Sequence, residues 1–197
     1  LTSNTEGDRN VAVGQNALSV NTTGVENIAI GRNALDANTT ASNNVAVGDS
    51  ALTASTTGQY NTAIGHAALL ANTTGENNTA VGQGTAEKLT TGAQNTAIGH
   101  RAMNNGIVTG IDNTALGRSA GYNLSSGSNN LLLGHDAGFT GSPGGNLTTG
   151  DNEIAIGDEN IASASIQVDW TVASDQRDKT DFTALDLGLD FVKALAP

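Results

Sequence analysis

The apolar residues of this chain fall in short clusters that recur at a fixed distance. A five-residue unit reads Asn, then Val, Ile or Thr, then Ala, then Val, Ile or Leu, then Gly. The closing glycines of successive units are separated by 17 residues, except for one step of 18 and a last step of 23. The nine copies are Asn10–Gly14, Asn27–Gly31, Asn44–Gly48, Asn61–Gly65, Asn78–Gly82, Asn95–Gly99, Asn113–Gly117, Asn130–Gly134 and Glu153–Gly157. A repeat that stays in phase over this length predicts a solenoid of stacked coils.

Each unit predicts a short β-strand, because Val, Ile and Thr favour strands and side chains alternate between the two faces. The fourth position is always Val, Ile or Leu, so we predict that it forms a buried ladder from Val13 to Ile156. The third position is Ala in every copy but Leu132. Its small side chains predict that another layer, or another chain, packs close to that face. The leading asparagines are expected to stack as an amide ladder along the coils.

The rest of each coil carries two further signals in the same phase. A pair such as Ala17-Leu18 follows the closing glycine and predicts a second short strand after a tight corner. A turn glycine stands three residues before each unit, replaced once by Ala41, so this turn cannot depend on a positive φ. The Thr-Thr-Gly turns reverse the chain, and sequons such as Asn21-Thr22-Thr23 are interpreted as turn chemistry rather than glycan sites.

The composition of the chain argues against several classes of partner. The formal net charge is −11 and the basic residues are scattered, which disfavours a nucleic-acid partner. Cysteine is absent, and no apolar run reaches the roughly 18 residues of a membrane span, so no membrane insertion is expected in this segment. The chain opens on Leu1 in mid-pattern, which indicates a piece of a longer protein. So thin an apolar core predicts that partner chains complete it, and a homo-oligomer is the natural inference.

The units Asn-Val-Ala-Val-Gly and Asn-Thr-Ala-Ile-Gly, each followed by xx-Ala, resemble the repeats of trimeric autotransporter adhesin heads. The resemblance covers about residues 4–161 and implies a left-handed parallel β-roll that assembles as a homotrimer. These repeats are longer than is typical of the adhesins, with Thr-Thr-Gly as an added turn. The alternative is a triangular left-handed β-helix. Two apolar strips per coil favour the roll, giving an all-β solenoid over residues 1–161.

A different sequence follows a connector at residues 162–173. Its pattern Ser-Asp-x-Arg-x-Lys-x-Asp begins at Ser174, after Trp170, and an amphipathic helical pattern follows it. This segment, residues 174–197, resembles the start of the intramolecular chaperone domain of endosialidases and other phage tail fibres. The resemblance implies self-cleavage between Ala173 and Ser174. Ser174 would be the nucleophile, Lys179 the base and Asp175 the residue that orients them. The alternative is a helix N-cap at Ser174 or Asp175.

Three histidines, His66, His100 and His135, directly follow the closing glycine of their repeats, where other copies carry Gln, Arg or Asp. This variability predicts an exposed corner, with an ion held between chains near a trimer axis as the alternative. No metal or cofactor is predicted.

The resulting hypothesis is a structural, non-enzymatic fibre segment of a phage tail fibre or spike, located in the virion. It would attach to a host or cell-surface receptor, a glycan among the candidates, and a self-cleaving chaperone would trimerise it. The alternative is a bacterial cell-surface trimeric adhesin or extracellular filament.

Overall fold

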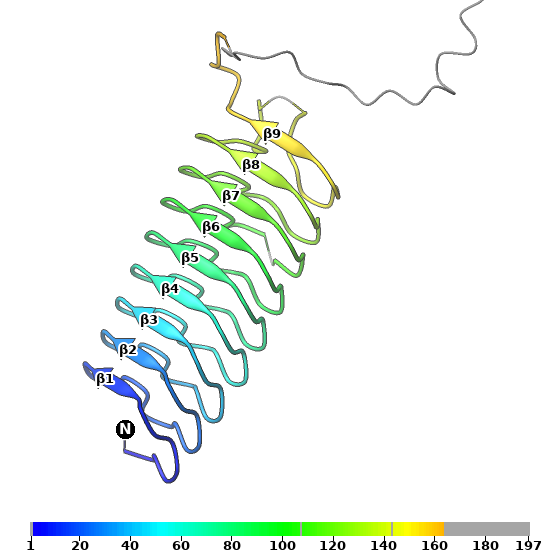
Figure 1. Cartoon of the computed structure of the whole chain (residues 1–197). Helices are drawn as coiled ribbons and strands as arrows, with labels where there is room; N and C mark the ends of the chain where they lie inside the picture. Colours follow the sequence, from blue (N-terminus) through cyan, green and yellow to red (C-terminus); the bar gives the residue numbers. More distant parts are fainter. Residues whose placement is uncertain (1, 107, 143, 164–197) are drawn as a thin grey trace, which may run out of the picture. The chain divides into compact units, whose positions relative to one another are not determined.

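A computed structural model describes residues 2–106, 108–142 and 144–163, which form a parallel β-solenoid (Figure 1). Each coil contributes one three-residue strand, and the strands stack in chain order into one parallel sheet. The strands are β1 (Val11–Val13), β2 (Ile28–Ile30), β3 (Val45–Val47), β4 (Thr62–Ile64), β5 (Thr79–Val81), β6 (Thr96–Ile98), β7 (Thr114–Leu116), β8 (Leu131–Leu133) and β9 (Ile154–Ile156). No helix occurs in the described part of the chain. The predicted all-β solenoid with coils about 17 residues apart is confirmed, whereas its left-handed sense and trimeric state stay predictions.

The strands pair with equivalent residues opposite one another, so each repeat position forms a straight column along the stack. The central residue of β2, Ala29, lies beside Ala46 of β3, and the same pairing continues through β9. These central side chains face the inside of the coil and are almost fully buried from β2 onward. They pack against a second buried column formed by Leu18, Leu35, Leu52, Leu69 and Met103. In most coils the core is therefore a small residue facing a large one.

The predicted orientation of the strands is wrong. The third strand residues, which we expected to form a buried ladder, point outward: Val13 is 57% exposed and Ile156 49%. The alanine face is the buried one, and the layer that packs against it is the Ala-Leu segment of the chain's own coils. Because two successive turns bring this segment back over the strand, the space inside admits only a methyl group opposite each leucine.

The predicted second strand at the Ala-Leu segment is also wrong, because the described residues there form turns. Asn16 and Leu18 adopt φ values of 59° and 48°, and equivalent residues in most other coils share this left-handed conformation. A left-handed backbone costs an ordinary residue about 1–2 kcal/mol. The coil-to-coil bond from the Leu18 N–H to the Ala34 carbonyl, 3.1 Å long, and full burial of the leucine offset that cost.

The predicted asparagine ladder is present and buried. Asn61 Oδ1 accepts hydrogen bonds from the backbone N–H and the side-chain amide of Asn78, at 3.0 and 3.1 Å. Asn61 Nδ2 donates to the Gly75 carbonyl at 2.8 Å. Each amide thus joins its own coil to the next and satisfies backbone groups that the turn leaves unpaired.

A second column of polar residues lies three positions before the turn glycine. The sequon asparagine Asn21 is fully buried and donates to Asn4 Oδ1 at 2.9 Å and to the Gly24 carbonyl at 3.0 Å. The interpretation of these sequons as turn chemistry is therefore confirmed. Asn38 continues the column, but Ser55 follows it and is too short to reach Asn38 Oδ1. Among the described residues, that oxygen is the buried side-chain atom without a hydrogen-bond partner.

Different constraints explain the closing glycines and the turn glycines. The closing glycine Gly48 has a φ of 138°, and a Cβ there would lie 2.5 Å from the Gly65 carbonyl oxygen, so both the backbone angle and the space exclude a side chain. The turn glycines such as Gly58 do not have a positive φ, as Ala41 predicted. A Cβ at Gly58 would lie 2.4 Å from the Gly75 carbonyl oxygen, so the close approach of the coils favours glycine there.

One coil exchanges the sizes of its core residues. Leu132, at the centre of β8, replaces the usual alanine and is fully buried. The positions that carry leucine in earlier coils are Gly121 and Gly138 on either side of it. A Cβ at Gly121 or Gly138 would come within 2.7 or 2.9 Å of a Leu132 methyl carbon. The leucine has thus moved from one wall of the coil to the other.

Candidate functional site

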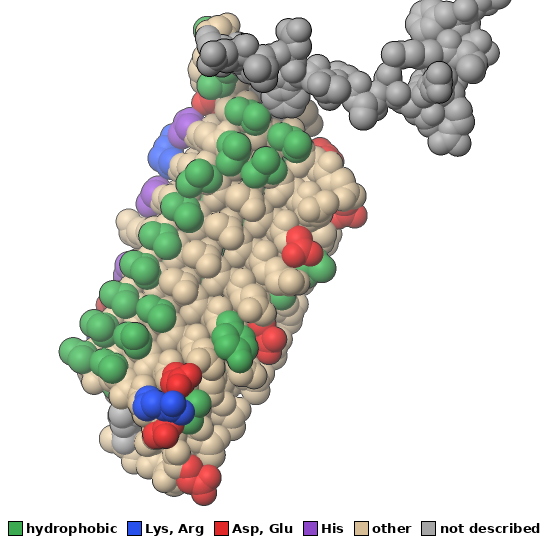
Figure 2. All heavy atoms as spheres, viewed as in Figure 1, with side chains coloured by type: hydrophobic (Ala, Val, Ile, Leu, Met, Phe, Trp, Pro, Cys, Tyr) green, Lys and Arg blue, Asp and Glu red, His purple; other side chains and the backbone are tan. Residues whose placement is uncertain are grey.

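The outward face of the sheet carries an unbroken apolar column, which we call the aliphatic ridge. It consists of the third residue of each strand: Val13, Ile30, Val47, Ile64, Val81, Ile98, Leu116, Leu133 and Ile156. Most of these side chains are more than a third exposed, and the rest are partly exposed. Figure 2 shows them as a continuous line of hydrophobic side chains over the strands. The ridge has nothing covering it among the described residues.

Beside the ridge, the residues that directly follow each closing glycine form a polar column, which we call the corner column. Its members are Gln15, Arg32, Asp49, His66, Gln83, His100, Arg118, His135 and Asp158. The three histidines are exposed, which confirms the predicted exposed corner. In-register stacking sets charges of opposite sign side by side: Arg32 Nη2 lies 2.8 Å from Asp49 Oδ2. The bonds from Ser50 and Arg32 lower the pKa of the Asp49 carboxyl below its ordinary range.

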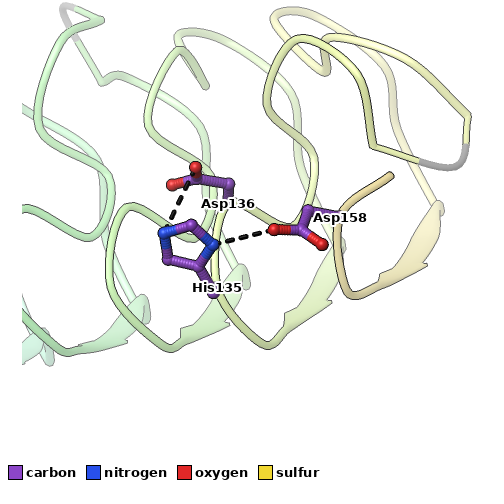
Figure 3. Close-up of side chains that lie close together, drawn as sticks. All are labelled: His135, Asp136 and Asp158. Carbon is purple, nitrogen blue, oxygen red and sulfur yellow. Dashed lines mark hydrogen bonds and ion pairs between the residues drawn. The ribbon is translucent and has the colours of Figure 1, made fainter. Parts of the chain in front are cut away.

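The densest group of titratable side chains lies where the last two coils meet. His135 stands between two carboxylates (Figure 3), with Nδ1 2.8 Å from Asp158 Oδ2 and Nε2 3.3 Å from Asp136 Oδ2. The guanidinium of Arg118 also contacts Nε2. Asp158 is largely buried, and the hydrogen bond to His135, followed by that from the Asn160 backbone N–H, lowers the pKa of its carboxyl.

This group is better suited to a hydrogen-bond relay than to a metal. A metal ion takes one ring nitrogen of a histidine, yet Asp136 and Asp158 address different nitrogens of His135. The ring would have to turn before both carboxylates and one nitrogen could share an ion. The Arg118 guanidinium would then oppose the ion's charge. In the structure, the hydrogen-bonded series Arg118–His135–Asp158 joins three successive coils of the corner column.

A small polar pocket opens along the corner column between the coils of β4, β5 and β6. It has a volume of about 290 Å³ and is lined by His66, Ala67, Gln83, Gly84, Glu87, His100 and Arg101. The Glu87 carboxylate is fixed by a 2.8 Å hydrogen bond donated by Asn104 Nδ2. Arg101 lies over the Tyr122 ring, 5.8 Å from its centroid. The pocket lining therefore includes a positioned carboxylate at Glu87 and the side chain of Arg101, whose guanidinium lies over the Tyr122 ring.

The predicted site residues Ser174, Asp175 and Lys179 lie outside the described residues, so the self-cleavage site stays a prediction. The ridge and the pocket were missed by the sequence reasoning. The ridge residues had been assigned to the core. For the pocket, the available signal was the pair of small residues, Ala67 and Gly84, at consecutive copies of a position that carries Asn, Ser or Arg in neighbouring coils.

No family model, curated protein or solved structure matches the chain. A search of the described residues for a helix of sufficient length and apolarity to cross a membrane found none. Arguments about function therefore rest on the ridge, the corner column and the repeats themselves.

Proposed function

We propose that the chain is a structural segment of a homotrimeric fibre of the phage tail fibre or spike type, whose coils associate through the aliphatic ridge and carry the fibre toward a host surface. The observation that supports it is the ridge: one exposed or partly exposed aliphatic side chain in every coil, in register over the nine described strands.

The size of the ridge argues that it is covered. Nine strands about 4.8 Å apart give a column roughly 40 Å long, and a strand of three residues makes the face about 10 Å wide. The outward face of the sheet is therefore on the order of 400 Å² per chain, and the ridge is its continuous apolar part. Monomeric proteins rarely expose contiguous apolar patches larger than a few hundred Å², and those that do use them for binding.

The period of the ridge favours identical chains as its partner. Ridge side chains repeat with the spacing of the coils, so only a surface with the same spacing can interlock with them along the whole stack. A parallel copy of this chain has that spacing by construction, and cyclic symmetry places the same face of each copy at a shared axis. The number three comes from the resemblance of the repeats to trimeric adhesin heads and of residues 174–197 to a trimerising chaperone.

Sedimentation of the full chain tests the assembly. We expect three chain masses for the native protein. The double variant Ile64→Asn/Ile98→Asn places polar groups at two exposed ridge positions and should give single chains, because an unpaired amide buried in the interface costs about 1–3 kcal/mol. The control Thr74→Asn/Thr91→Asn changes exposed turn positions of the same region and should remain trimeric. A folded native monomer at about 10 μM would contradict the proposal.

We also propose that the junction at Ser174 cleaves once. Ser174 Oγ attacks the Ala173 carbonyl while Lys179 accepts the hydroxyl proton, and water then hydrolyses the resulting ester, leaving a carboxylate on Ala173 and a free amine on Ser174. Mass spectrometry of the full-length protein checks this step. Two masses that sum to the intact chain plus one water are expected, and Ser174→Ala should stay intact. If Ser174→Ala is cut as readily as the native chain, the assignment of Ser174 is wrong.

A further inference from the structure

The pocket beside the corner column arises from a local loss of side chains. The second residue after each closing glycine has a left-handed backbone in most coils and carries Asn16, Asn33, Ser50, Ala67, Gly84, Arg101, Ser119 and Asp136 in turn. Ala67 and Gly84 are the two smallest members and are consecutive. His66 and His100 project from the corner column on either side of Gln83. Small residues therefore form the floor of the pocket over two coils, and polar side chains form its walls.

The lining has the chemistry of a site for a ligand that is both anionic and rich in hydroxyl groups. Arg101 lines the pocket and is exposed, and a guanidinium can pair with a carboxylate through two parallel hydrogen bonds. The Glu87 carboxylate, positioned by Asn104, can only accept hydrogen bonds. Gln83 and the two imidazoles can both donate and accept. The overall charge of the chain is −11, so a cation held at a pocket rim is an exception on its surface.

We propose that this pocket binds one carboxylate-bearing sugar unit, of the uronic or sialic acid class, displayed on a cell-surface polysaccharide. Arg101 would hold the sugar carboxylate, while Glu87 and Gln83 accept from and donate to its hydroxyl groups. The inference rests on the proposed attachment function and gives the receptor a chemical class. A volume of about 290 Å³ lies at the lower end of small-molecule pockets, which suits one sugar ring rather than a longer segment.

Two other ligand classes fit less well. A phosphate carries nearly two negative charges, and the fixed Glu87 carboxylate in the same small pocket would repel it. A neutral sugar would offer the Arg101 guanidinium no anionic partner. A sugar with one carboxylate and several hydroxyls uses both charged side chains.

Saturation-transfer NMR on the full chain tests the proposal, with 3′-sialyllactose and a hyaluronan tetrasaccharide as acidic probes. Lactose serves as the neutral probe and inorganic phosphate as the bare anion. We expect transfer to at least one acidic probe, with affinity at least about tenfold higher than for lactose, and no displacement by equimolar phosphate. Arg101→Gln should remove the preference for the acidic sugar while leaving the fold unchanged, because its side chain is exposed.

Ala67→Asn fills the floor, and Asn is compatible with the backbone because Asn16 and Asn33 occupy the same position in earlier coils with φ values of 59° and 56°. It should abolish binding. Ser50→Asn makes the same change one coil outside the pocket and should bind normally. The proposal is overturned if no acidic probe binds, if lactose or phosphate competes equally, or if Ser50→Asn loses binding with Ala67→Asn.

Sedimentation of the same samples measures their mass, so the assembly proposal and the pocket proposal can fail independently. A trimer that binds no acidic sugar overturns the pocket alone. A monomer that binds the acidic probe overturns the assembly alone.

Discussion

Replacing Leu132 with alanine removes the one large side chain at the centre of a strand. Its methyl carbons fill the space that Gly121 and Gly138 leave open in the facing wall. The coil-to-coil hydrogen bonds on both sides, such as that from the Gly121 N–H to the Ala137 carbonyl at 2.8 Å, hold the walls apart. The site therefore cannot collapse around the missing atoms.

The expected cost is about 3–5 kcal/mol, the upper part of the range for leucine-to-alanine changes, because that range increases with the volume of the cavity that persists. Unlike most core truncations, this one has a rescue that the chain itself suggests. Earlier coils carry alanine at the strand centre and leucine on the facing wall, with Leu18 and Leu69 at φ values of 48° and 52°. Gly121 has a φ of 62°, close to the same conformation.

The rescue variant is Leu132→Ala/Gly121→Leu. Gly121→Leu alone should cost at least about 1–3 kcal/mol, since its Cβ would lie 2.7 Å from a Leu132 methyl carbon. Once Leu132 is removed, the nearest remaining atom is Met103 Cγ at 3.4 Å, an ordinary contact. The double variant should therefore be more stable than either single variant, with an interaction energy of about 2 kcal/mol or more.

Urea unfolding followed by far-ultraviolet circular dichroism measures the cycle at one fixed protein concentration, because the proposed assembly would make stability depend on concentration. The four slopes against urea should agree, which shows that the same surface unfolds in each variant. If the effects of Leu132→Ala and Gly121→Leu simply add, the size exchange between the two walls does not exist and the account of the core is wrong.

Two further predictions concern polar groups. Ser55→Asn should raise the free energy of unfolding by about 1 kcal/mol, because the longer amide can donate to Asn38 Oδ1; an unchanged urea midpoint would contradict this. The pKa of Asp158 is below its ordinary value of 3.8 because of its bond to His135, so its contribution to stability is present above that value and is lost as the pH falls through the lowered pKa. Asp158→Asn should therefore lower the urea midpoint at pH 6, and this difference from the native protein should shrink as the pH falls below 3.8. The control Asp112→Asn, at an exposed aspartate, should leave the midpoint at pH 6 unchanged.

The sequence predicts the period, the strand positions and the asparagine ladder because each of these repeats with the coil. Every coil of a solenoid meets copies of itself, so a residue that must satisfy its neighbour recurs at the same position. Asn61 and Asn78 bond to one another because each occupies the same position in its own coil. The alternative for the sequons was decided in the same way, by the burial of Asn21 and Asn38.

The same reasoning could not predict which face of each strand is buried. Alternation shows that Ala29 and Ile30 point in opposite directions, but not which of them points inward. Larger aliphatic residues are usually the buried ones, and that general preference gave the wrong answer. The coil is so narrow that its interior is filled by leucines from the other wall, which leaves room only for alanine. The informative signal was the exchange of sizes at Leu132 and Gly138, since two positions that trade volume must share one space.

The two outward columns differ in a way that bears on the assembly. The third strand position is aliphatic in every coil, whereas the first position changes to threonine in β4 through β7 and is aliphatic elsewhere. If both columns simply faced water, nothing would explain this difference, since the two columns belong to the same short strands. A partner that covers the third position along its whole length, and the first position only toward the ends, accounts for it. The contact between chains would then be centred on the ridge, with the threonines of the middle coils at its edge.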